Sequence, residues 1–299
     1  MIMSTEDINP RCTDIDTLGV AEIFAIINAE DATVAAAVRG AGPQICEAIN
    51  DAVETIRAGG RLLYVGAGTS GRLGVLDASE MPPTFSVDSS LIRAVIAGGP
   101  AAITTSVEGA EDDEEAGIRA IADLKPGDML IGITASGRAP FVLAALREAK
   151  GRAIKAWLLS CNDVSCDFPV DGAIVVLTGP EVVSGSTRLK AGTATKMVLN
   201  MISTITMIRL GRVFRGYMID VVPSNDKLRR RALWIVQETT GCSADSAREL
   251  LEMAAGSAKT AILMYLKGVN YDQATGMLQR AGGGLRRALE LPSSGDGAS

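Results

Sequence analysis

The stretch LLYVGAGTSGRLG, residues 62–74, decides the fold of this chain. Its first four residues are apolar and predict a short buried strand, while the glycines that follow predict a tight turn into a helix. Glycine lets the backbone approach a ligand closely, Thr69 and Ser70 offer hydroxyl donors, and a helix N-terminus presents free N–H groups. The stretch therefore predicts a strand, a candidate phosphate-binding loop and a helix in direct succession.

The same alternation continues along the next hundred residues. The expected strands are 62–65, 92–97, 129–133, 154–159 and 173–177, and the expected helices between them are 71–79, 114–124 and 140–150. Short, mostly apolar strands alternating with helices indicate a parallel sheet covered on both faces. We therefore expect an α/β three-layer sandwich around a five-stranded parallel sheet, with ligands bound at the carboxyl ends of the strands.

A second loop of the same chemistry follows the third expected strand. It reads TASGRAP, residues 134–140, and supplies Thr134, Ser136 and Gly137 ahead of a proline that opens a helix. Neither loop is a GxxxxGK[ST] motif. The first loop matches GxGxxG in spacing, but the second strand ends in glycines rather than in the acid that a dinucleotide site needs. Hydroxyl-rich loops favour a phosphomonoester, and turns that bind nothing are the alternative.

The composition narrows the possible chemistry. The chain has 299 residues, a net charge of -6 and no histidine. The charge gives no reason to expect nucleic acid or a membrane surface as a partner, and no apolar run approaches the length of a bilayer span, so we expect a cytoplasmic protein. Without histidine, proton transfer falls to Glu, Asp, Lys, Tyr, Cys or water. The five cysteines include no CxxC pair and are interpreted as free thiols.

Three acidic segments are candidates for that chemistry. In DASEMPPTF, residues 77–85, Glu80 stands before two prolines, whose rigid backbone fixes its direction. In EGAEDDEE, residues 108–115, the start of a solvated helix accounts for the last four acids but less well for Glu108 and Glu111. In GPEVVSGST, residues 179–187, Glu181 follows the fifth strand, and the hydroxyls there are expected to cap the next helix.

The remaining segments are mostly helical. Helices are expected at 20–28, 31–39 and 43–58, and a long apolar helix at 187–212 suits a core or a dimer interface. Four more are expected at 225–240, 243–254, 258–266 and 271–281. The predicted organisation is an N-terminal arm with helices at 1–42, an α/β domain that carries both loops at 43–224, a helical module at 225–291 and a disordered tail at 292–299.

Four long strings resemble one known family. They are GAGTSGRLGVLDASEMPPTF (66–85), EGAEDDEE (108–115), ASGR (135–138) and GSTRLKAGTATKMVLNMIST (185–204). They are similar, in the same order, to the N-acetylmuramic acid 6-phosphate etherases, which have the sugar isomerase (SIS) phosphosugar-binding fold. The similarity covers almost the whole chain. It implies a small C-terminal domain like a ubiquitin-associated (UBA) domain, and a homodimer.

The resemblance implies a reaction and its residues. The family removes D-lactate from N-acetylmuramic acid 6-phosphate by elimination and then adds water, giving N-acetylglucosamine 6-phosphate for cell-wall recycling with neither metal nor cofactor. By string match, Glu80 protonates the departing lactate and then activates water, and Glu111 takes the C2 proton. The implied substrate contacts are Thr69, Ser70, Thr134, Ser136, Gly137 and Glu181.

Two alternatives stay open at this point. A phosphosugar sensor without turnover, like the glucokinase regulatory proteins, needs the loops but has no use for Glu80 and Glu111. A sugar-phosphate isomerase commonly uses histidine for ring opening, and this chain has none.

Overall fold

The computed structural model describes residues 5–163, 166–221, 223 and 225–292. The predicted disordered tail therefore lies outside the described residues, apart from Pro292. The chain divides into two compact units. The first comprises Met1–Ser79 and Ser89–Thr204, and the second comprises Glu80–Asp88 and Ile205–Ser299.

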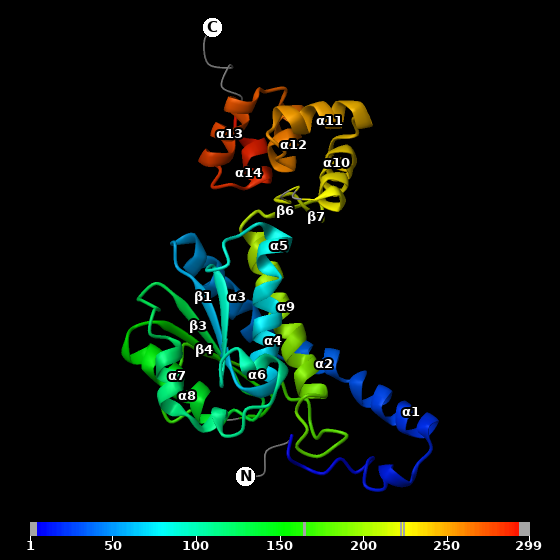
Figure 1. Cartoon of the computed structure of the whole chain (residues 1–299), viewed down its shortest axis with the longest axis vertical. Helices are drawn as coiled ribbons and strands as arrows, with labels where there is room; N and C mark the ends of the chain where they lie inside the picture. The colour runs from blue at the N-terminus through cyan, green and yellow to red at the C-terminus, as the bar shows by residue number, and fades with distance from the viewer. Residues whose placement is uncertain (1–4, 164–165, 222, 224, 293–299) are drawn as a thin grey trace. The chain divides into compact units, whose positions relative to one another are not determined.

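The first unit is built on one parallel sheet, as predicted (Figure 1). Its strands are β1 (Leu62–Gly66), β2 (Ile92–Ile96), β3 (Met129–Ile133), β4 (Lys155–Ser160) and β5 (Gly172–Val175). They lie in the order β2-β1-β3-β4-β5, and every pair is parallel. In this order the chain winds outward in both directions from the β1/β3 pair, which makes that pair the topological switch point of the sheet.

Helices cover both faces of this sheet. On one face, the strand residues Leu63, Leu130 and Leu158 pack with helix α8 (Pro140–Gly151) and with residues that flank α7 (Glu114–Ala120). On the other face, α4 (Gly68–Ser79) lies on β1 and β2, and α3 (Gly42–Arg57) approaches β4, where the Trp157 indole N–H donates to Asp51 over 2.8 Å. The three-layer sandwich is confirmed.

The first residues of this unit form an arm with little core of its own. It contains the 3-10 turn η1 (Ile15–Thr17), α1 (Val20–Asp31) and α2 (Val34–Gly40), and Figure 1 shows α1 leading away from the sheet. The arm is tied back by a buried ion pair, because Lys190 Nζ lies 2.6 Å from a Glu30 carboxylate oxygen.

The long helix α9 (Lys190–Arg209) begins three residues later and ends three residues earlier than predicted. Its first turn is capped by a carboxylate rather than by the hydroxyls of the preceding segment. Both oxygens of Glu181 accept backbone N–H groups, one from Lys190 and one from Ala191, each over 2.9 Å.

No helix among the described residues is long and apolar enough to span a membrane.

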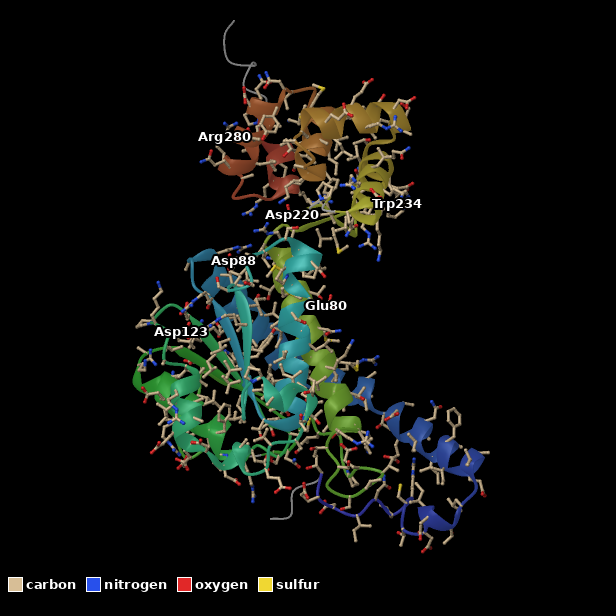
Figure 2. The ribbon with its side chains drawn as sticks, viewed as in Figure 1. Glu80, Asp88, Asp123, Asp220, Trp234 and Arg280 are labelled. Carbon is tan, nitrogen blue, oxygen red and sulfur yellow. The ribbon has the colours of Figure 1, made fainter. Side chains whose placement is uncertain are left out.

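The second unit is a helical module with its own core. It contains α5 (Met81–Phe85), the end of α9, a short antiparallel pair β6 (Val213–Phe214) and β7 (Tyr217–Met218), and α10 (Asp226–Thr240), α11 (Ala244–Met253), α12 (Ala258–Lys267), α13 (Tyr271–Arg280) and α14 (Leu285–Glu290). The side chains of Asn225, Ser243, Ser257 and Asn270 cap four of these helices. Trp234, labelled in Figure 2, packs edge-on against Tyr217 with 5.1 Å between ring centroids.

The shortest helices and strands were not predicted from the sequence. The hairpin β6-β7 has two residues per strand, and α5, α6 (Ala101–Thr104) and α14 have six residues or fewer. Elements of this length contain too few residues to show a hydrophobic period.

Candidate phosphosugar site

The two Ser/Gly loops leave the sheet from neighbouring strands. Gly66, the last residue of β1, pairs with Ile133, the last residue of β3. The loops that follow therefore start side by side at the carboxyl edge of the sheet, at its switch point. Anionic and nucleotide ligands of such folds bind in this crevice. The structure thus brings together the two segments that the sequence singled out separately.

The first loop is shaped by two glycines that touch. A Cβ atom on Gly71 would lie 2.6 Å from the carbonyl oxygen of Gly66, and one on Gly66 would lie 2.7 Å from the Gly71 nitrogen. Only glycine fits either position, because real Cβ contacts do not reach such distances. This close turn sets the first turn of α4, with Thr69 partly exposed and Ser70 buried, directly after the strand. Free N–H groups of a helix N-terminus favour an anion at this place.

The second loop is held by its own hydroxyls. The Thr134 and Ser136 hydroxyl oxygens lie 3.3 Å apart, and the Arg138 backbone N–H donates to Ser136 over 3.2 Å. The Gly137 N–H donates to the Thr134 carbonyl over 3.0 Å, and Gly137 has a φ of 74°, a conformation that favours glycine. Asn162 holds the loop from behind, since its amide donates to the Ala135 carbonyl over 2.9 Å.

Glu111 lies at the same edge of the sheet. It belongs to the 3-10 turn η2 (Ala110–Asp112), which packs against α8, the helix that begins after the second loop. Its side chain is exposed. Next to it, a cavity of about 570 Å³ opens after β2, between residues that include Gly98, Glu108, Asp113, Arg119 and Phe141. The volume is in the range of small-ligand sites. Glu108 and Arg119 are thus cavity residues that the sequence did not single out as substrate contacts.

Glu181 has a different environment from the other predicted contacts. It is fully buried, and both of its oxygens are bonded to the first turn of α9. The described contacts therefore fix the segment after β5 against α9. A substrate contact by Glu181 stays a prediction.

Glu80 is the residue that follows α4. It is exposed and precedes α5, whose first turn contains Pro82 and Pro83. Its backbone carbonyl accepts the N–H of Thr84 over 3.2 Å, so the backbone that carries the carboxylate is fixed by that turn and by the two prolines.

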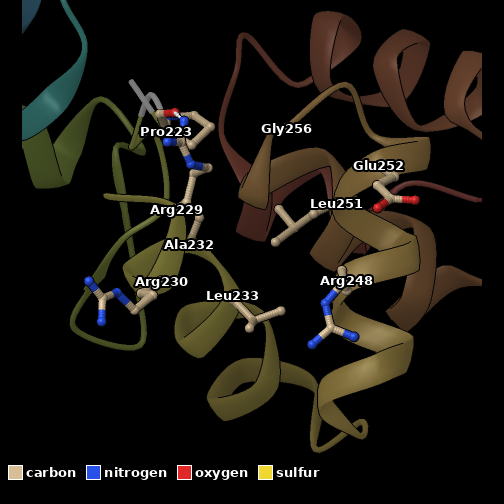
Figure 3. A pocket seen from close by; sticks show the side chains of 9 residues that line it. All are labelled: Pro223, Arg229, Arg230, Ala232, Leu233, Arg248, Leu251, Glu252 and Gly256. Carbon is tan, nitrogen blue, oxygen red and sulfur yellow. Dashed lines mark hydrogen bonds between the residues drawn. The ribbon is translucent and has the colours of Figure 1, made fainter. Parts of the chain in front are cut away.

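The second unit has a separate groove (Figure 3). It has a volume of about 430 Å³ and lies between α10 and α11, with Leu233 and Leu251 projecting into it from the two helices and Arg248 beside them. It contains none of the residues predicted to contact the substrate.

A deeper polar cluster lies between β1, α4 and α9. Asp77 accepts a hydrogen bond from the Ser203 hydroxyl over 3.0 Å, and the Tyr64 hydroxyl lies nearby. Burial raises the pKa of Asp77 to about 6, although the Ser203 and Tyr64 hydroxyls and the Lys196 ammonium offset part of the effect.

Comparisons with known proteins agree with the fold. Residues 44–150 match the family of glucokinase regulatory protein N-terminal SIS domains. A solved Bacteroides fragilis structure, named as a candidate phosphosugar isomerase of capsule formation, is 18% identical, has a TM-score of 0.50 and covers 67% of this chain and 95% of that one. At this identity the likeness shows the SIS-type fold alone.

Similarity over the full length is much closer. The N-acetylmuramic acid 6-phosphate etherase of Rhizobium rhizogenes is 48% identical over 97% of this chain and 95% of its own. The etherase of Mycolicibacterium smegmatis is 47% identical over 96% of this chain and 97% of its own. This chain therefore belongs to the N-acetylmuramic acid 6-phosphate etherase family.

Proposed function

We propose that this protein cleaves the D-lactyl ether of N-acetylmuramic acid 6-phosphate with water, releasing D-lactate and N-acetylglucosamine 6-phosphate. The observation that carries the proposal is the near-full-length identity of 46 to 48% to several etherases. The paired loops at the switch point support it, because they suit the phosphate that this substrate carries.

The phosphate is assigned to the two loops. Thr69 and Ser70 offer hydroxyls in the first turn of α4. Thr134, Ser136 and Gly137, in the loop after β3, lie on the other side of the crevice. Hydroxyls and backbone N–H groups bind a tetrahedral anion without a permanent positive charge.

The two exposed carboxylates are assigned the proton transfers. Once the sugar ring is open, Glu111 removes the C2 proton, which the C1 aldehyde makes acidic. The electron pair forms the C2–C3 double bond, the C3–O bond breaks, and Glu80 protonates the departing lactate. Glu80 then takes a proton from water, which adds at C3, while C2 is reprotonated. This balance needs no oxidant or reductant. Glu181 is assigned to a substrate hydroxyl or to ring opening.

The test is release of lactate from the purified chain incubated with N-acetylmuramic acid 6-phosphate. We expect Glu80→Gln to abolish release while phosphosugar binding persists, because the amide cannot donate the proton that lactate needs. Glu114→Gln, an exposed change at the start of α7, serves as the matched control and keeps the wild-type rate. Folded wild-type protein that binds the substrate but releases no lactate refutes the proposed reaction.

A second candidate is a phosphosugar sensor without turnover. The match of residues 44–150 to the glucokinase regulatory protein SIS domain favours it. Binding of sugar phosphates without any lactate release is its signature, so the same assay separates the two.

The remaining assignments are a cytoplasmic homodimer and the domain boundaries. The α1 arm supports a dimer, because Val20 and Phe24 on its surface are 87% and 68% exposed. We assign the phosphosugar-binding domain to 43–224 and a UBA-like module to 225–291. Sedimentation of the chain tests the homodimer. Separate expression of residues 225–291 tests whether that module folds on its own.

A further inference from the structure

The backbone carbonyl of Ala135, in the second loop, is held by three donors. It accepts the backbone N–H of Cys161 over 3.0 Å, the side-chain amide of Asn162 over 2.9 Å and the Ser160 hydroxyl over 3.4 Å. All three donors stand at the end of β4 or directly after it, and none is more than 1% exposed. A carbonyl oxygen has two lone pairs, so buried groups fix the direction of this one.

The direction of this carbonyl sets the direction of the next N–H. A trans peptide is planar, so its C=O and N–H point in opposite directions, and the described residues contain no cis peptide bond. The Ala135 carbonyl faces the β4 side of β3, and β1 lies on the other side. The Ser136 N–H therefore points toward the side of the first loop, where the phosphate is assigned. The donors on the carbonyl also polarise the peptide, which strengthens this N–H as a donor.

Asn162 is in turn held by Thr5, near the start of the chain. The Thr5 backbone N–H donates to the Asn162 amide oxygen over 3.1 Å, and the Asn162 amide nitrogen donates to the Thr5 hydroxyl over 2.7 Å. Thr5 is fully buried. This reciprocal pair fixes which way the amide faces, and the same amide nitrogen donates to Ala135. A residue far away in the sequence is thus linked to the second loop through one side chain.

The segment that carries Thr5 has a fixed place on the first unit. The carbonyl of the next residue, Glu6, accepts the Ser184 hydroxyl over 3.1 Å, and Ser184 lies in the segment after β5. Near the end of α1, Glu30 forms the buried ion pair with Lys190. The arm is therefore anchored at two places besides Asn162, so Thr5 can support the loop.

We propose that Thr5 is a positioning residue for the phosphate, because through Asn162 it holds the Ala135–Ser136 peptide with its N–H toward the crevice. The inference rests on the proposed function and deepens the assignment of the phosphate to the second loop. Thr5 acts without contacting the substrate. When its hydroxyl is removed, the Asn162 amide loses the partner that orients it, and the Ser136 N–H is no longer fixed toward the phosphate.

Binding of N-acetylglucosamine 6-phosphate, the proposed product, tests the proposal by calorimetry on the full chain. Thr5→Val keeps the shape of the side chain but lacks the hydroxyl, and its Kd should rise about tenfold. Thr5→Ser keeps the hydroxyl and should restore the wild-type affinity. Thr13→Val makes the same change at an exposed position of the same arm and is the matched control. Wild-type affinity in a folded Thr5→Val chain overturns the proposal.

A second variant guards against a failure to fold. Thr5→Cys replaces the hydroxyl by a thiol, which is a weak acceptor, and takes the place of Thr5→Val if that chain is unfolded. The same rise in Kd is expected, and an unchanged Kd counts equally against the proposal.

A double-mutant cycle tests whether Thr5 acts through Asn162. Asn162→Ala removes the amide donor to the Ala135 carbonyl and should raise the Kd about tenfold or more. Adding Thr5→Val to Asn162→Ala should then change the Kd no further, because the link is already broken. Additive effects of the two changes would show that Thr5 acts by another route and would overturn the proposal.

Steady-state kinetics of lactate release separate positioning from a general loss of structure. The phosphate is remote from C2 and C3, so Thr5→Val should raise KM about tenfold and leave kcat within about twofold. A partly unfolded sample would instead lower kcat at an unchanged KM, and that result contradicts the proposal. Wild-type chain that binds N-acetylglucosamine 6-phosphate but releases no lactate refutes the proposed reaction, whereas the binding series decides the role of Thr5 by itself.

Discussion

Glu181 and Asp77 are buried carboxylates that both accept hydrogen bonds from α9, and they differ in how well they are satisfied. Glu181 is fully buried, and each of its oxygens accepts a backbone N–H of the first turn of α9. Asp77 is 7% exposed and accepts a good hydrogen bond from Ser203 on one oxygen. Among the described residues, its other oxygen and the Tyr64 hydroxyl are buried without a well-formed hydrogen bond. From this difference we expect the number of donors, rather than burial, to decide whether a buried acid stabilises the fold.

The largest expected effect is that of Glu181→Ala. It removes the acceptor of two buried N–H groups, and each unsatisfied group costs about 1 to 3 kcal/mol. We expect the free energy of unfolding to fall by about 3 to 5 kcal/mol, measured by urea denaturation. Glu115→Ala, at an exposed site, is the control and should change it by less than about 0.5 kcal/mol. A loss below about 1 kcal/mol for Glu181→Ala would remove the contrast with Asp77.

Asp77→Asn should have a smaller effect of opposite sign. The folded-state pKa of Asp77, about 6, lies above the ordinary aspartate value, so the folded state binds the proton more tightly. Stability therefore falls as the pH rises from about 4 to above 6. Asparagine carries no charge and still accepts from Ser203. Above pH 6 the variant should be more stable by about 2 to 3 kcal/mol, and near pH 4 the difference should vanish.

Unfolding midpoints of both proteins between pH 4 and pH 8 check this expectation. Parallel pH dependences in the wild type and in Asp77→Asn would show that Asp77 does not titrate in this range.

The smallest effect is expected for Ser203→Ala. The change removes the donor to Asp77, so stability at neutral pH should fall by about 1 kcal/mol. The pKa of Asp77 should rise, because the Ser203 hydrogen bond lowers it. The pH at which the wild type loses stability should then move upward in the variant. Thr204→Ala, one residue along at an exposed position, is the control. An unchanged pH profile in Ser203→Ala would mean that this hydroxyl does not stabilise the Asp77 carboxylate.

Much of the first unit could be predicted from its sequence. The strands are mostly apolar and the loops carry glycine and hydroxyls, so both their existence and their meeting at one edge follow from local pattern and parallel topology. The start of α9 could not be predicted in this way. The hydroxyls before it suggested the usual cap, whereas the cap is Glu181, nine residues ahead of Lys190, and only the folded chain brings them together.

The candidate site was predictable in kind but not in arrangement. Glu80 and Glu111 were identified from strings that resemble a family, and a string contains no distances. The length of α4 separates Glu80 from the loops, and that separation depends on where the helix ends. Asp77, in the same string as Glu80, gave no signal of burial, because its partners Tyr64 and Ser203 are distant in sequence.

The contact between Gly66 and Gly71 has a consequence for how this loop tolerates mutation. Any replacement of Gly71 introduces the same Cβ atom at 2.6 Å from a carbonyl oxygen, whatever the rest of the side chain. In a saturation-mutagenesis map, all nineteen alternatives at this position should fail alike, whereas Thr69 should show graded tolerance that depends on the hydroxyl. A uniform profile beside a graded one would separate the residue that shapes the turn from the residue that uses it.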